Sequence, residues 1–366
     1  MIYVENLLNL LSKKKLSFFT GVPDSVLKPL STYLENKKNH IIAPNEGAAI
    51  SLGIGYYLAT KKLACVYMQN SGLGNAINPL ASISHPKVYS IPIVLIIGWR
   101  GRPNTIDEPQ HMTKGLITED LLRLLGIDFC TLDNEKDLNK LKPLIDKAKR
   151  LKKPVACLVK NKFLKSKKKI KIKIKENIYP YRHEIIYEIL KLINPNSRLI
   201  ATTGFTSREL YQIRKNSNIV KGKDFYVVGG MGHCSSVALG YSLKSKKEVI
   251  CLDGDGSILM HLGSLLTIGS FAKKNFKHIL FNNNSHESVG SQKTNADKVN
   301  FKLLSKSLGY NRYYKINNKK KIRTHLKKFL KSKGPSLLEI KIKNGSIENL
   351  KRPKNLKNIK NLFIKH

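Results

Sequence analysis

In the first half of the chain, segments whose apolar residues have helical spacing alternate with short, continuous apolar runs. Apolar residues three and four apart predict helices at 4–11, 25–35 and 133–151. Short runs with few polar residues predict strands at 18–20, 64–68, 94–97 and 155–159. Continuous apolar strands are typical of a parallel sheet that is buried on both faces. The pattern therefore predicts an α/β domain.

The second half repeats this alternation. Helices are predicted at 183–192 and 261–273, and strands at 198–202, 248–252, 277–281 and 336–342. A glycine-rich turn lies at 228–233. Together the two halves predict an α/β protein with two doubly wound parallel-sheet domains.

A lysine-rich stretch separates the two halves. Because its charge density favours a solvated connector, we predict a first domain at 1–160, a charged linker at 161–178 and a second domain at 179–350. The basic tail at 351–366 is only weakly apolar, so we expect it to lie at the periphery.

The sequence Gly-Asp-Gly-Ser at 254–257 follows one predicted strand, and Asn283 follows the next. Ligands of open α/β sheets bind at the carboxyl ends of strands, where Asp255 and Asn283 are expected to meet. Their oxygens are hard ligands suited to Mg²⁺. Gly254 and Gly256 would allow a diphosphate to approach the backbone closely. We therefore predict a site for magnesium and a diphosphate.

Glu46 is a second candidate, at the start of a helix rich in small residues that follows a predicted strand end and a Pro-Asn turn. An acidic residue at this position also stabilises the helix dipole, which is a sufficient explanation if Glu46 is considered alone.

The formal net charge of +41 is extreme. Such a charge raises the possibility of nucleic-acid binding. The basic residues are spread through the chain, without a nucleic-acid-binding motif or interleaved aromatic residues, so we expect no nucleic-acid partner. A positive field would instead help to gather an anionic substrate and cofactor.

Five cysteines show no paired metal-ligand spacing, and most lie in apolar runs, so we expect reduced thiols. The start of the chain lacks a signal-peptide pattern. The most apolar run, at 88–99, is too short to span a bilayer. We therefore expect a cytoplasmic enzyme without a membrane partner.

Several short motifs together resemble one family. They are GVPDS at 21–25, NEGA at 45–48, QNSGLGN at 69–75, WRG at 99–101, DEPQH at 107–111, GMGH at 230–233 and NNSHESVG at 283–290. With the Gly-Asp-Gly-Ser and Asn-Asn pattern, they resemble the thiamin diphosphate (ThDP) dependent 2-oxo-acid decarboxylases, and among these the phosphonopyruvate and sulfopyruvate decarboxylases. The resemblance implies a pyrimidine domain and a diphosphate domain without the middle domain of larger relatives.

The resemblance also implies how the cofactor is held. The side chains of Asp255 and Asn283 and the carbonyl of Ser285 would bind Mg²⁺. Diphosphate contacts would come from Thr203, Gly204, Gly256 and Ser257. The Gly229 carbonyl would accept a hydrogen bond from the pyrimidine. Met231 would be the apolar wedge that bends the cofactor, although a methionine there can also simply fill the core.

By the same resemblance, Glu46 activates the cofactor from the partner subunit, which implies a homo-oligomer with its active site at the subunit interface. Protonation of the product needs an acid near neutral pH, for which His111 and His286 are candidates with Asp24 assisting. Each of these three could equally be a helix cap or make a structural hydrogen bond.

The second anionic group of the substrate needs cations or amide donors. The candidates are Asn70, Ser71, Arg100 and Gln110. The forked donors of arginine suit tetrahedral oxyanions, although any single arginine is weak evidence in so basic a chain.

The implied reaction converts 3-phosphonopyruvate into phosphonoacetaldehyde and CO₂, on a route to 2-aminoethylphosphonate. The nearest alternative is sulfopyruvate decarboxylation. A single fused chain favours the phosphonate substrate, because sulfopyruvate decarboxylases are often split into two subunits. Less favoured alternatives are a carboligase, a non-catalytic ThDP-fold protein and a nucleic-acid-binding protein.

The sequence departs from the family pattern at two turns. Asn284-Ser285 stands where these relatives usually have Gly-Ala, and Gly290-Ser291-Gln292 replaces Gly-Gly-Gln. Both changes are small and leave cofactor binding intact, but they affect the expected shape of the substrate pocket.

Overall fold

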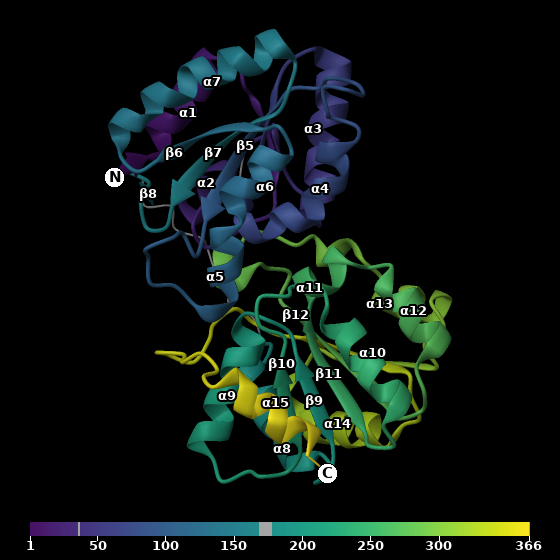
Figure 1. Ribbon diagram of the computed structural model, residues 1–366. Helices are drawn as coiled ribbons and strands as arrows, with labels where there is room; N and C mark the ends of the chain where they lie inside the picture. Colours follow the sequence, from purple (N-terminus) through teal and green to yellow (C-terminus); the bar gives the residue numbers. More distant parts are fainter. Residues whose placement is uncertain (36, 168–177, 366) are drawn as a thin grey trace. The chain divides into compact units, whose positions relative to one another are not determined.

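The computed structural model describes residues 1–35, 37–167 and 178–365, and Figure 1 shows the fold. The part of the predicted linker at 168–177 lies outside the described residues. The chain divides into two compact units, one formed by residues 1–172 with 289–292 and the other by 173–288 with 293–366.

The first unit is built on a parallel six-stranded sheet. Its strand order is β3 (His40–Ile42), β2 (Phe18–Gly21), β4 (Ala64–Gln69), β5 (Ile93–Trp99), β7 (Val155–Lys160) and β6 (Asp128–Leu132). A separate parallel pair joins β1 (Ile2–Tyr3) to β8 (Leu164–Lys165), so part of the predicted linker belongs to a strand.

Helices cover both faces of this sheet. On one face, Cys65 and Tyr67 of β4 lie in a core with α1 (Val4–Lys13), α2 (Lys28–Leu34) and α7 (Leu138–Leu151). On the other face, Val66 and Met68 lie in a core with α3 (Glu46–Thr60), α4 (Leu73–Ala81) and α6 (Thr118–Leu124). A further helix, α5 (Pro109–Leu116), lies in the connection after β5. Burial on both faces explains why these strands read as continuous apolar runs.

The second unit has a parallel six-stranded sheet of its own. Its strand order is β10 (Lys223–Tyr226), β9 (Arg198–Ala201), β11 (Val249–Gly254), β12 (Phe276–Asn282), β14 (Ser336–Lys341) and β13 (Arg312–Ile316). Numbered from the first strand of each sheet, both orders are 2-1-3-4-6-5. The two sheets therefore have the same topology, and the predicted α/β class with two parallel-sheet domains is confirmed.

Two apolar cores flank the second sheet. One core contains α8 (Arg182–Leu192), α9 (Phe205–Asn216) and α14 (Ile322–Lys331). The opposite core contains α10 (Cys234–Lys244), α11 (Asp255–Met260), α12 (Ser264–Phe271) and α13 (Phe301–Ser307).

The tail, which was expected to be peripheral, contains a helix, α15 (Leu356–Ile364), that packs onto the second unit through Phe363. Phe363 is 4% exposed, and its ring lies 5.5 Å from that of Phe225 and 5.0 Å from that of Tyr241. The Arg198 guanidinium donates to the carbonyl oxygens of Phe363 and Lys365 at 3.0 and 2.9 Å. One aromatic anchor and two hydrogen bonds thus fix a segment whose composition is mostly polar.

Three predicted helices begin elsewhere. The helix expected from residue 25 begins at Lys28, because Oδ1 of Asp24 accepts from the backbone N–H groups of Val26 and Leu27 at 2.6 and 3.2 Å and holds a turn there. The helix expected from 133 begins at Leu138, after a short 3₁₀ turn (Glu135–Asp137) capped by Asn134.

The helix expected at 261–273 is wrong at its start. A helix already begins at Asp255, and His261 interrupts it with φ −132° and ψ 55° before α12 begins at Ser264. The consequence is that Asp255 occupies the first position of a helix that follows the strand directly.

Candidate active site

The predicted site residues collect at the carboxyl ends of strands, next to the point in each sheet where the strand order reverses. In the second unit, β9 leads to Thr203, β11 leads to Asp255 and β12 leads to Asn283. In the first unit, Asp24 follows β2 and Asn70 follows β4. This is the position at which open α/β sheets bind ligands.

Asp255 is 3% exposed, and its Oδ2 accepts a hydrogen bond of 2.6 Å from the Thr294 hydroxyl. Burial raises the pKa of Asp255 to about 6, while the Thr294 hydrogen bond and the positive charge of Arg182 act to lower it. The Thr294 hydroxyl also lies 3.2 Å from Oδ1 of Asn284, so the residues after β11 and β12 share one network. The carboxyl ends of β11 and β12 therefore lie side by side, as predicted.

Asn283 uses both ends of its amide. Its Oδ1 accepts from the backbone N–H of Ser285 at 3.1 Å, and its Nδ2 donates to Oε2 of Glu287 at 3.1 Å. Among the described residues, the buried Ser285 hydroxyl has no hydrogen-bond partner. Three oxygen donors are therefore available here: the buried carboxylate of Asp255, the fixed amide oxygen of Asn283 and the hydroxyl of Ser285. Oxygen donors of this kind fit a hard cation such as Mg²⁺.

Glycines make room around Asp255. A Cβ on Gly256 would lie 2.8 Å from two atoms of the His286 imidazole, so only glycine allows this ring so close. Gly204 has φ 88°, a conformation that favours glycine, and it precedes the first turn of α9 with Thr203 beside it. Nothing would contact a Cβ on Gly254 within 4 Å, which leaves open space at the strand end.

The Ser257 hydroxyl ties the site together. It lies 3.0 Å from the Thr202 hydroxyl and accepts from the backbone N–H of Gly232 at 3.2 Å. Gly232 belongs to the glycine-rich turn, in which Gly229 has φ 71° and Met231 is partly buried. The turn that carries Gly229 and Met231, the two residues predicted to contact the rings of the cofactor, is therefore hydrogen-bonded to the Gly-Asp-Gly-Ser segment.

Burial lowers the pKa of His286 to about 4. Its imidazole is therefore neutral near pH 7. In this environment it can donate one hydrogen bond and accept another, but it does not hold a spare proton.

In the first unit, Glu46 begins α3 and is 6% exposed. The side-chain amide of Asn75 donates to its Oε2 at 2.7 Å. A Cβ on Gly72 would lie 2.3 Å from Oε1 of Glu46, so the missing side chain at 72 makes room for the carboxylate. Lys114 is also electrostatically close: burial lowers its pKa, and the negative charge of Glu46 acts to raise it.

Asp24 and His111 are both buried, at 4% and 8% exposure. Burial raises the pKa of Asp24 to about 6, with a smaller raising contribution from the negative charge of Glu46. Oδ1 of Asp24 caps its own turn, whereas its buried Oδ2 has no hydrogen-bond partner among the described residues. His111 lies in α5, which follows β5. Asp24 thus combines a raised pKa with a carboxylate oxygen that makes no hydrogen bond to the described residues.

The predicted substrate-binding residues are engaged with the protein to different degrees. The Asn70 amide donates to the Arg100 carbonyl and the Thr118 hydroxyl, both at 2.9 Å, and accepts from the Arg100 N–H at 3.1 Å. The Arg100 guanidinium forms a two-pronged ion pair with Asp107 and donates to the Ser25 hydroxyl at 3.0 Å. Ser71 accepts from Gln69 at 2.7 Å, and Gln110 is partly exposed on α5.

Several supporting residues were not predicted. Asn75 and Glu287 lie within the family-like motifs, but nothing in their spacing indicated a partner. Thr294 and Arg182 had no sequence signal, because each acts on the site through a contact that only the folded chain creates.

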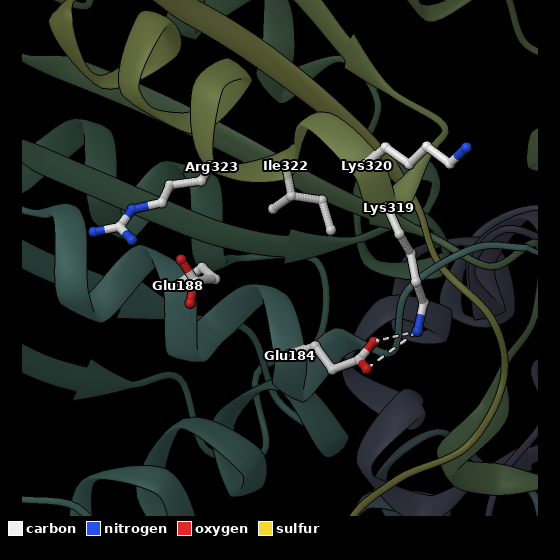
Figure 2. Close-up of a pocket in the computed structure, with 6 residues that line it drawn as sticks. All are labelled: Glu184, Glu188, Lys319, Lys320, Ile322 and Arg323. Carbon is white, nitrogen blue, oxygen red and sulfur yellow. Dashed lines mark hydrogen bonds and ion pairs between the residues drawn. The ribbon is translucent and has the colours of Figure 1, made fainter.

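A surface pocket in the second unit is a different feature, shown in Figure 2. It is lined by Glu184, Glu188, Lys319, Lys320, Ile322 and Arg323, and Lys319 pairs with Glu184 at 3.2 Å. None of the predicted site residues lines it. No helix in the described part of the chain is both long and apolar enough to cross a membrane.

Comparisons with known proteins agree with this arrangement. The family model "Thiamine pyrophosphate enzyme, N-terminal TPP binding domain" matches residues 1–121, and its C-terminal counterpart matches residues 201–340. A phosphonopyruvate decarboxylase of Streptomyces hygroscopicus is 32% identical, over 97% of this chain and 91% of the relative. One of Streptomyces viridochromogenes is 32% identical, over 91% and 87%. A sulfopyruvate decarboxylase of Methanosarcina acetivorans is 26% identical, over 93% and 92%.

Proposed function

The chain belongs to the thiamine pyrophosphate enzymes and to their decarboxylases, and we propose that it converts 3-phosphonopyruvate into phosphonoacetaldehyde and CO₂. The observation that carries this substrate is identity over nearly the whole length to two phosphonopyruvate decarboxylases. We also propose a role in 2-aminoethylphosphonate biosynthesis, for which phosphonoacetaldehyde would be the precursor.

Sulfopyruvate is the second candidate substrate. The expectation that a fused chain argues against it carries little weight, because a similar sulfopyruvate decarboxylase also spans both halves as one chain. The preference for phosphonopyruvate rests on the higher full-length identity, 32% against 26%.

Asp255 and Asn283, with the Ser285 carbonyl, would hold Mg²⁺ for the diphosphate. Backbone groups around Gly204, Gly254 and Gly256, with Thr203 and Ser257, would contact the diphosphate itself. Gly229 and Met231 would contact the rings. When bound, ThDP supplies the electron sink that lets CO₂ leave.

Glu46 would hold and return a proton at the cofactor's pyrimidine, with its carboxylate oriented by Asn75. Asp24 has an unpartnered oxygen and a pKa of about 6, so it suits proton delivery to the product. His111 is the second proton donor in this proposal. His286, which is neutral near pH 7, would position groups by hydrogen bonding.

The phosphonate would be bound by Ser71, Gln110 and Arg100. Asp107 and Ser25 engage three of the five N–H donors of Arg100, so the remaining donors would contact the phosphonate. Asn70 fixes the loop that carries Ser71.

We also propose a homo-oligomer in which Glu46 reaches the cofactor of the partner subunit, as the family resemblance implies. A cytoplasmic location is proposed because all five cysteines are free thiols, which suits a reducing compartment.

The test is phosphorus NMR of phosphonopyruvate incubated with protein, ThDP and Mg²⁺, beside a sulfopyruvate reaction followed by CO₂ release. Faster, cofactor-dependent formation of phosphonoacetaldehyde would support the proposal. Turnover of sulfopyruvate alone would overturn the substrate and keep the decarboxylase. A Glu46→Gln protein is the control for non-enzymatic decarboxylation.

A further inference from the structure

Glu287 lies in the 283–290 motif and has no role in the function proposed above. Its carboxylate makes three hydrogen bonds. Oε1 accepts from the backbone N–H of Gly345, and Oε2 accepts from Arg182 and from Nδ2 of Asn283, the last at 3.1 Å. Both oxygens are therefore occupied, and one of them faces the side chain that would bind the metal.

Arg182 holds this carboxylate from behind. It is the first residue of α8 and is 5% exposed, and its other guanidinium nitrogen lies 3.3 Å from Oε2 of Glu209, which is fully buried. Arg182 thus lies between the carboxylates of Glu209 and Glu287, away from water. Because the loss of either ion pair would leave a buried charge without its partner, the three side chains form a rigid unit.

The contact fixes the orientation of the Asn283 amide. A carboxylate accepts hydrogen bonds only, so Glu287 selects the amide NH₂ as its neighbour and turns Oδ1 the other way. Oδ1 accepts from the Ser285 N–H and keeps a second lone pair. A metal ion needs that oxygen, and the opposite orientation would present NH₂ to it.

We propose that Arg182 and Glu287 are positioning residues that lock the Asn283 amide in its metal-binding orientation. This inference rests on the proposed metal site, but not on the identity of the substrate. Partners of this kind commonly change metal affinity when they are substituted.

The experiment measures Mn²⁺ binding in the presence of ThDP by the loss of the free-ion electron paramagnetic resonance signal. Glu287→Gln places an amide beside Asn283 that can face it with either its oxygen or its nitrogen, so the orientation is no longer imposed. We expect Mn²⁺ affinity to fall about 10- to 100-fold. The kcat at saturating metal should stay close to that of the parent, because the substitution lowers only the fraction of protein that has metal bound.

Glu209→Gln is the matched control, because it disturbs the same arginine without touching Asn283. It should reduce Mn²⁺ affinity much less than Glu287→Gln does, because the carboxylate that faces Asn283 is kept. In an Asn283→Ala background, Glu287→Gln should have no further effect on Mn²⁺ affinity, a coupling that a purely structural role would not produce. If Glu287→Gln fails to fold, Glu287→Asp keeps the charge, withdraws the carboxylate from Asn283 and carries the same expectation.

Unchanged Mn²⁺ affinity in a folded Glu287 variant, an equal loss in Glu209→Gln, or additive effects in the Asn283→Ala background would each overturn the inference. A parent protein whose Mn²⁺ affinity depends on Glu287 as expected, but which leaves phosphonopyruvate intact, would overturn the proposed substrate alone. A parent that binds no Mn²⁺ with ThDP would overturn the metal site and the inference together.

Discussion

Asn75 donates its side-chain N–H to Oε2 of Glu46 across 2.7 Å, from one helix to the start of another. The carboxylate is 6% exposed, and Gly72 lies against its other oxygen. One hydrogen bond and one missing side chain thus define where this carboxylate lies in the first unit.

Glu46→Gln keeps the size of the side chain and its contact with Asn75 but cannot exchange a proton. We expect decarboxylation to fall by about 100- to 10,000-fold, the range for a lost acid–base group, while ThDP still binds. Steady-state rates and a ThDP titration by circular dichroism check this. Glu119→Gln, at a partly exposed residue of α6 that pairs with Arg123, is the control and should keep full activity. Near-parental activity of Glu46→Gln would rule out Glu46 as the activating residue.

Gly72→Ala tests the room around Glu46. The new Cβ would lie 2.3 Å from Oε1, so the carboxylate must move. Because a displacement of about 1 Å can cost roughly 100-fold in rate, we expect a loss of that order in a folded protein. Gly74→Ala is the matched control, since nothing lies within 4 Å of its Cβ. Equal activities of the two variants would contradict the assigned position of Glu46.

Asp24→Asn should make stability less dependent on pH. The pKa of Asp24 rises from 3.8 to about 6 on folding, so between these values the unfolded chain ionises first and the parent loses stability as pH increases. Above pH 6 the loss is complete and amounts to roughly 3 kcal/mol. We expect the variant to be roughly 1–3 kcal/mol more stable than the parent at pH 8, where the buried charge is absent, and similar to it below pH 4.

Urea unfolding at both pH values measures this difference, and activity should fall in the same variant. A variant that is less stable than the parent at pH 8 would show that Asp24 is ionised and compensated in the folded protein.

Asp107→Asn should destabilise the protein, because it removes the ion-pair partner of Arg100. The two side chains are 10% and 6% exposed, and the ion pair holds the pKa of Asp107 below its usual range. Removal of the carboxylate leaves a buried guanidinium without its partner, which costs about 3–5 kcal/mol. Asp133→Asn removes the partner of Arg102, a pair that is 26% and 39% exposed, and should cost less than about 1 kcal/mol. Thermal unfolding of the two variants compares them, and equal losses would contradict the prediction.

Ser291→Gly should stabilise the protein. Ser291 has φ 63°, in the left-handed region where a side chain costs about 1 kcal/mol. After the greater freedom of glycine in the unfolded chain is counted, we expect a gain of roughly 0.5 kcal/mol, measured by thermal unfolding. Asn284→Gly should gain less, because Asn284 at φ 55° is a residue type that tolerates this conformation. A loss of stability in Ser291→Gly would mean that its side chain makes a compensating contact.

Sequence alone determined the fold class and placed the candidate site residues after the ends of strands. Continuous apolar runs are short-range signals of buried parallel strands, and polar residues that follow them must lie at one edge of the sheet. The strand pattern is therefore sufficient to place Asp255 and Asn283 together. Glu46 could be placed only at a helix start, since its role came from family resemblance.

Only the tertiary structure decided which side chains support these groups. Arg182 meets Glu287 across 105 residues and Thr294 meets Asp255 across 39, distances over which local propensity carries no information. Phe363 likewise looked like part of a polar tail until folding brought two aromatic rings beside it. The physical reason is that strand ends are set by local pattern, whereas orientation, burial and pKa depend on neighbours that only the packed chain brings together.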